Sequence, residues 1–286
     1  MFNLFSAVES GPHISLKAEK IFEIGTFEVT NSMIYGLFVA IFLMIVGSYV
    51  AKRAKVSPVG GLVQIFELTM EFIIGMLEDI FKSKDKAIKY APIFGTFFIF
   101  IVVSNISGLM PIVGEGVNVE DIPVFRPFTA DLNATIAMSV IAILTVQYLS
   151  IKESGFMGHL KHYFTDKPFN PINMFIGVLE VFGEVTRVIS LSLRLFLNTA
   201  VGEILIAVFI FVGSFAAPIT VLPIVLFEIL VALIQAYVFT VLSATYLGLA
   251  IAHSHDHADD EHTEEVHNHS DINTGTIPAS NGVSGN

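Results

Sequence analysis

The chain has 286 residues, of which 53% are hydrophobic and only 14% are charged. An ordinary soluble domain carries about 25% charged residues, so this chain has too little polar surface to cover a soluble globule of its size. It contains no cysteine, which excludes a disulfide framework, a thiol nucleophile and a thiolate metal site. The composition predicts an integral membrane protein.

The formal net charge of −11 is concentrated near the C-terminus. Residues 253–286 hold seven of the 26 acidic residues and none of the 15 basic ones, which leaves a net charge of −4 in residues 1–252. The same segment holds six of the nine histidines and ends in Gly, Ser, Asn and Pro, a composition typical of disordered chain. We expect a disordered tail that chelates metal ions weakly at most, through His253, His255 and His257.

Five stretches are long enough to cross a bilayer, whose core of ~30 Å needs about 20 apolar residues. They are residues 29–51, 91–114, 132–151, 171–213 and 220–252. The segment 57–81 is also apolar, but it is interrupted by one Gln and four acidic residues and therefore predicts an amphipathic helix at the interface. The fold class is an all-α integral membrane protein with a membrane domain over 29–252.

The last two helices, 171–213 and 220–252, are longer than one bilayer thickness at about 1.5 Å per residue. Ala217-Pro218 interrupts the pattern between them, so we expect a hairpin that is strongly tilted from the membrane normal. Ten of the 15 basic residues lie between the first and second spans or after the third, and three lie on the opposite side. The positive-inside rule then places the segment 1–28 outside and the tail in the cytoplasm.

A stripe of polar side chains follows the first of these long helices. At about 100° per residue, its members fall within an arc of about 120°: Glu180, Glu184, Arg187, Ser190, Arg194, Asn198 and Gly202. Glu203 lies off this stripe, and Glu228 and Gln235 share one face of the next helix. An arginine in a membrane helix costs about 2.5–3.5 kcal/mol, and ionisable residues there mark ion pathways by default. A single structural ion pair would explain only two of the six ionisable residues.

The sequence Ser190-Leu-Ser-Leu-Arg194-Leu-Phe-Leu-Asn198-Thr-Ala-Val-Gly202-Glu203 resembles the signature helix of subunit a of rotary F-type ATP synthases. Residues 233–239 resemble the next helix of that family, and residues 104–111, 127–135 and 167–171 resemble segments farther upstream. The similarity runs from residue 11 to residue 252 and leaves the tail outside.

The resemblance implies a stator subunit, without a catalytic site of its own, that couples an ion gradient to ATP synthesis. Its partners would be a rotating ring of c subunits, against which the tilted hairpin packs, and the b-subunit peripheral stalk in a bacterial inner membrane. Arg194 matches the essential arginine that faces the ring. A fixed cation favours the ionised form of a passing carboxylate, and it blocks protons from crossing directly between two aqueous half-channels.

By the same resemblance, Glu203 and Glu228 line the inlet half-channel, with Asn198 and Gln235 as polar neighbours and Gln235 approaching Arg194. In the family these two acidic positions are often one Glu and one His. Two carboxylates would replace a Glu–His relay by a pair whose titrations are coupled.

Three residues match positions on the exit side: Glu180, Arg187 and Ser190. Arg187 fits a snorkelling anchor equally well, Glu184 has no counterpart that we can assign, and Gly202 fits close helix approach. Asn105 and Pro111 are interpreted as helix-end residues to which we assign no chemistry.

Two other functions fit parts of the sequence. A secondary ion antiporter would use paired acids and broken helices, but no internal repeat relates the two halves of the chain. A metal-ion transporter would explain the His-rich tail, but the five spans contain no His. The absence of nucleotide-binding motifs predicts no nucleotide site, and we expect no cofactor and no nucleic-acid partner.

Overall fold

The computed structural model describes residues 20–24, 27–53, 61–110, 118–119, 122–123, 126–163, 171–213 and 216–273. Within these ranges the chain is almost entirely helical, and its six α-helices are α1 (Asn31–Arg53), α2 (Gly61–Phe81), α3 (Lys84–Gly108), α4 (Leu132–Tyr163), α5 (Pro171–Gly213) and α6 (Ala217–Asn273). A short 3-10 helix, η2 (Phe128–Ala130), precedes α4. Two small antiparallel hairpins, which the sequence did not predict, lie outside the spans: β1 (Lys20–Ile24) with β2 (Phe27–Thr30), and β3 (Asn118–Val119) with β4 (Ile122–Pro123).

Five helices are long and apolar enough to cross a membrane. Their candidate spans are Asn31–Arg53, Lys84–Gly108, Leu132–Glu153, Gly177–Gly213 and Ala217–Ile251. The remaining helix, α2, carries the acidic residues that led us to expect an interfacial helix. The predicted fold class, an all-α membrane protein, is confirmed.

Three helices, α3, α4 and α6, extend beyond the ranges that hydropathy predicts because polar residues continue a helix beyond its apolar part. α3 begins at Lys84 rather than at residue 91, directly after a tight turn in which Lys82 has φ 52°. Asp85 lies in the first turn of α3, where its negative charge stabilises the helix by interacting with the positive end of the helix dipole. α4 continues to Tyr163 across a bend at Gly155, where φ is 74°.

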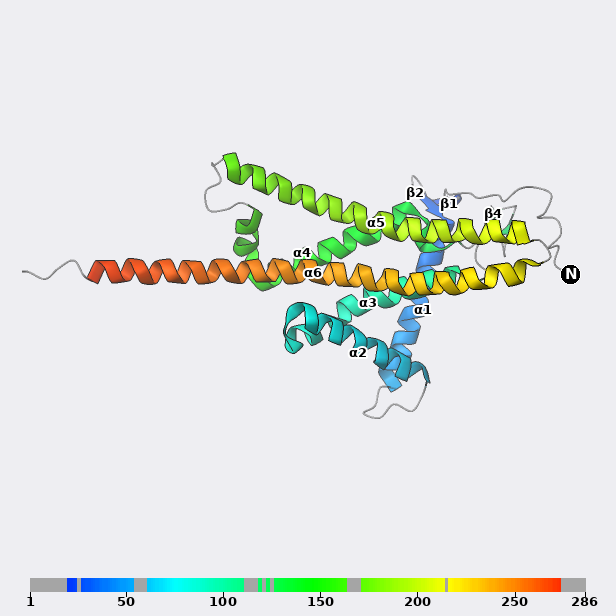
Figure 1. The fold of residues 1–286 in the computed structure, drawn as a ribbon, viewed down its shortest axis with the longest axis horizontal. Helices are drawn as coiled ribbons and strands as arrows, with labels where there is room; N and C mark the ends of the chain where they lie inside the picture. Colours follow the sequence, from blue (N-terminus) through cyan, green and yellow to red (C-terminus); the bar gives the residue numbers. More distant parts are fainter. Residues whose placement is uncertain are drawn as a thin grey trace, which may run out of the picture.

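α5 and α6 form a long antiparallel hairpin, and α1 runs across the hairpin direction at a steep angle (Figure 1). Pro218 lies in the first turn of α6, where its missing N–H costs no helical hydrogen bond. If α1 stands close to the membrane normal, this arrangement requires a strongly tilted hairpin. The tilt itself stays a prediction.

α6 continues to Asn273, past residue 252, where the apolar pattern ends. The helical backbone from 253 to 273 differs from the disorder predicted there. No Gly or Pro occurs in this stretch, so the local sequence does not break a helix that the apolar part has already begun. The side chains of His253, His255 and His257 lie outside those that the structure describes.

The core lies where α2 to α6 meet, with α6 at its centre in contact with α2, α3, α4 and α5. Its largest fully buried apolar side chains include Tyr90, Phe94, Leu191, Leu195, Phe239 and Leu247. Small buried residues recur every four positions on α6, at Ala232, Ala236, Thr240 and Ala244. Because these side chains are small and lie on one face of α6, neighbouring helices can approach its backbone closely. The outward faces of α5 and α6 remain apolar and exposed.

Candidate functional site

A small polar cavity of about 20 Å³ lies between α3, α5 and α6. Glu203 and Asn198 reach it from α5, and Glu228 reaches it from α6. The rest of its lining is Asn105, Gly108, Leu109, Thr199 and Ala232. A cavity of this size holds about one water molecule. Three of the residues that the sequence predicts for an inlet pathway therefore share one water-sized polar space.

The two carboxylates are brought together by a glycine. A Cβ atom built on Gly202 would lie 2.5 Å from Oε2 of Glu228 and 2.7 Å from its Cδ. The Glu228 side chain, which is only 8% exposed, therefore lies against the backbone of α5 next to Glu203. Any side chain at residue 202 would displace this carboxylate, which agrees with the expectation of close helix approach at Gly202.

A chain of polar contacts reaches the cavity from η2. Thr129 donates a hydrogen bond of 2.7 Å from Oγ1 to Oδ1 of Asn105, and the hydroxyl of Thr199 lies 3.1 Å from that of Thr129. Nδ2 of Asn105 is buried and has no partner within the described ranges. The interpretation of Asn105 as only a helix-end residue was therefore incomplete, because α3 turns its amide into the cavity. A polar amide inside the apolar stretch 91–114 was the signal that could have found it.

Arg194 is half-buried on α5, between the fully buried Leu191 and Leu195. In the part of the chain that the structure describes, it forms no hydrogen bond and no ion pair. Gln235 on α6 is buried, and its Nε2 atom also has no partner among the described residues. The expected approach of Gln235 to Arg194 therefore does not appear as a hydrogen bond. Arg194 is thus a permanently charged side chain without a partner in its own described chain.

The residues predicted for the exit side are arranged differently. Arg187 forms an ion pair of 2.5 Å with Glu184, one turn earlier on α5, and its guanidinium lies 4.5 Å from the ring centre of Tyr246 on α6. Glu180 is half-buried and Ser190 is exposed. Neither Glu180, Arg187 nor Ser190 lines the polar cavity. Of the predicted stripe, Asn198 lines the cavity, whereas Glu184 and Arg187 form a packed ion pair more than two turns away on α5.

Comparison with known families identifies the chain. A family model described as ATP synthase A chain matches residues 32–248. The chain belongs to this family. The resemblance that the sequence around Arg194 predicts is thereby confirmed. The matched range includes the cavity, Arg194 and Gln235, whereas the tail lies beyond it.

Relatives within the ATP synthase A chain family match most of the chain. The ATP synthase subunit a of Moorella thermoacetica is 31% identical over 229 residues, which cover 80% of this chain and 94% of the relative. The ATP synthase subunit a of Gloeobacter violaceus is 30% identical over 254 residues, which cover 89% of this chain and 95% of the relative. The ATP synthase subunit a of Geobacter sulfurreducens is 33% identical over 227 residues, which cover 79% of this chain and 89% of the relative.

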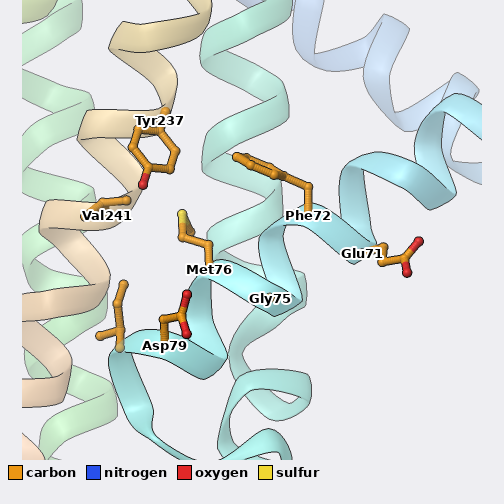
Figure 2. Close-up of a pocket in the computed structure, with 8 residues that line it drawn as sticks. Glu71, Phe72, Gly75, Met76, Asp79, Tyr237 and Val241 are labelled. Carbon is orange, nitrogen blue, oxygen red and sulfur yellow. The ribbon is translucent and has the colours of Figure 1, made fainter.

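A second, more open groove of about 440 Å³ lies between α2 and α6, away from the predicted site residues. Phe72, Met76 and Asp79 of α2 face Tyr237 and Val241 of α6 across it, while Glu71 points away (Figure 2). Among the described residues, no group of three or more His, Cys, Asp or Glu could hold a metal ion.

Proposed function

We propose that this multi-pass membrane protein is the proton-translocating stator subunit of an F-type ATP synthase, and that Arg194 keeps the carboxylates of a c-subunit ring ionised as protons pass to and from them through two half-channels. The observation that carries the proposal is the state of Arg194. It lies in the helix of the family signature, it is always charged, and nothing in the described chain neutralises it. An unpaired charge at membrane depth is costly, so a carboxylate supplied by a partner is the simplest compensation.

The apolar face beside Arg194 supports this role. Leu193 and Leu197, which flank it on the helix surface, are 40% and 51% exposed. An exposed apolar surface of α5 with one cation in it suits a ring of helices that presents an apolar surface with one carboxylate per subunit. The cation stabilises the ionised form of each passing carboxylate. It also repels protons, and so blocks a direct leak between the half-channels.

The polar cavity supplies the inlet half-channel in this proposal. Protons entering from outside reach Glu203 and Glu228, with Asn198 and Gln235 as polar neighbours on the way to the ring. A proton that crosses in this way gains about 2.3 kcal/mol per 100 mV of membrane potential. Glu180 and Ser190 belong to the exit side, whereas the contact with the Tyr246 ring, together with the ion pair to Glu184 on its own helix, makes Arg187 an anchor between α5 and α6.

The proposed assembly has the c ring against the outer face of the α5–α6 hairpin, and the b-subunit stalk elsewhere on the chain. The proposed membrane is the bacterial inner membrane. The N-terminus would lie outside and the tail in the cytoplasm, the orientation that the distribution of Lys and Arg predicts. A secondary antiporter is the competing function, and it differs in needing no ring.

Vesicles that contain the whole synthase test the proposal. We expect Arg194→Ala to abolish ATP-driven proton pumping while the complex still assembles in the membrane. Pumping by Arg194→Ala at the wild-type rate would refute the proposal.

Reconstitution separates the stator from the antiporter. Liposomes with this chain alone should not conduct protons, whereas liposomes with the chain, the ring and the stalk should. Conduction by the chain alone at the rate of the complex would favour the antiporter.

A further inference from the structure

Arg126 is a buried cation that no prediction from the sequence included in the site. It precedes η2 and is only 6% exposed. Its Nη2 atom donates a single hydrogen bond of 3.3 Å to the carbonyl oxygen of Ala130, and its Nε atom has no partner within the described ranges. No ion pair of Arg126 occurs there either. A buried charge that is not paired is strongly unfavourable unless another charge nearby compensates it.

Asp131, the first acidic residue after Arg126 in the sequence, does not form an ion pair with it. Asp131 accepts a hydrogen bond of 2.7 Å from the Ser32 hydroxyl with one oxygen, and one of 2.9 Å from the backbone N–H of Asn133 with the other. Both carboxylate oxygens thus hold the start of α4 and attach α1 to it. Both oxygens of Asp131 are therefore directed at neutral donors, and no ion pair joins Asp131 to Arg126 in the described chain.

The η2 turn instead brings Arg126 beside the polar cavity. Thr129, in the same turn, contacts both Asn105 and Thr199, which line the cavity together with Glu203. Ala130, which accepts the hydrogen bond from Arg126, is the next residue of this turn, so the guanidinium is held at the turn that reaches the cavity lined by Glu203. Among the described residues, the charged groups that line the cavity are Glu203 from α5 and Glu228 from α6, and Arg126 joins them from the segment before η2, while α3 contributes the neutral Asn105.

We propose that Arg126 is a positioning residue of the inlet pathway, a second fixed cation that sets the number of protons held by Glu203 and Glu228. The proposal rests on the proposed function. A cluster in a dry interior is most stable when it is electrically neutral. With Arg126 counted, two carboxylates and one guanidinium are neutral when they hold one proton between them. One carboxylate then stays free to accept the next proton from outside as the first moves toward the ring.

Without Arg126 the same neutrality requires a proton on each carboxylate. Both groups would then be occupied, and a relay with no vacant acceptor passes protons slowly. Arg126 therefore acts through Glu203 and Glu228 and need not touch the moving proton.

The test measures ATP-driven proton pumping by the whole synthase in vesicles, after the amount of assembled complex has been equalised. We expect Arg126→Gln to pump about tenfold more slowly, the size of effect that a nearby opposite charge has on carboxylate protonation. Arg126→Lys, which keeps the charge, should stay within about twofold to threefold of wild type. Arg53→Gln is the matched control, because it removes a cation that lies over the Tyr49 ring at the end of α1, far along the chain from the cavity.

A double-mutant cycle excludes a purely structural role. If Arg126 acts through Glu203, adding Arg126→Gln to Glu203→Gln should slow pumping by less than about twofold further. Wild-type pumping by Arg126→Gln, or an equal loss in both backgrounds, would overturn the proposal. Arg194→Ala, measured in the same preparations, distinguishes failure of the Arg126 proposal from failure of the proposed function. If it abolishes pumping while Arg126→Gln does not, only the role of Arg126 is wrong.

Discussion

Two arginines lie two turns apart on the same face of α5, in surroundings that differ completely. Around Arg187 the chain supplies a carboxylate on its own helix and an aromatic ring on α6, so the guanidinium is neutralised and packed. Around Arg194 the described chain supplies neither, although the neighbouring leucines bury part of its stem. The first arrangement fastens two helices together. The second leaves a charge available to a partner, as the proposed stator role requires.

The strongest test of this difference removes each arginine separately. Arg194→Ala should eliminate pumping, whereas Arg187→Ala should leave pumping measurable and lower the free energy of unfolding by about 1 kcal/mol, because a partly exposed ion pair and a cation–π contact are each worth about that or less. Proton pumping in vesicles and thermal unfolding of the purified complex measure the two effects. Equal loss of pumping in the Arg187 and Arg194 variants would show that the two arginines do not differ in function.

The next effect in size concerns the two carboxylates of the cavity. Glu203→Gln and Glu228→Gln should each slow proton flow without uncoupling it from ATP hydrolysis, because Arg194 still prevents a leak. The measurement is the ratio of protons pumped to ATP hydrolysed, together with the rate. A double Gln variant with normal flux would remove both residues from the pathway.

A smaller effect is expected from the glycine that makes room for Glu228. Gly202→Ala should displace the carboxylate and slow pumping by several-fold, without loss of assembled complex, since the displaced group is the end of a flexible side chain. Gly183→Ala is the matched control on the same helix, because nothing lies within 4 Å of the Cβ atom it would add. Identical pumping by the two variants would contradict the contact between Gly202 and Glu228.

The smallest effect should come from Asn105. Asn105→Ala removes an amide that accepts a hydrogen bond from Thr129 and lines the cavity, but it leaves both carboxylates in place. We expect a loss of pumping of about twofold to fivefold, comparable with one hydrogen bond of about 0.5–1.5 kcal/mol. Ser107→Ala, on the same helix and outside the cavity lining, serves for comparison. Equal pumping rates in the Asn105→Ala and Ser107→Ala variants would show that Asn105 has only a structural role.

Much of this site could be predicted from local sequence. The spacing of Arg194, Asn198 and Gly202 places them on one face because helical periodicity is a local property. Asn105, Thr129 and Arg126 could not be placed in the same way. They lie on α3, on a short 3-10 turn and in an irregular segment, and their position beside Glu203 depends on how these elements pack together. Helix ends were also missed where polar residues extend α3 and α6 beyond their apolar parts.

By itself, the sequence determined that this is a helical membrane protein, which family it belongs to, and that charged residues persist where a bilayer makes them costly. These features follow from composition, periodicity and a signature around one arginine. Only the tertiary structure decided that Arg187 also packs on the Tyr246 ring of α6 and that no described helix brings a carboxylate to Arg194, although both arginines have the same chemistry and the same helical face. It also decided that Glu203 and Glu228 share one cavity, because the approach of two helices depends on the glycine between them and on the packing of the whole bundle.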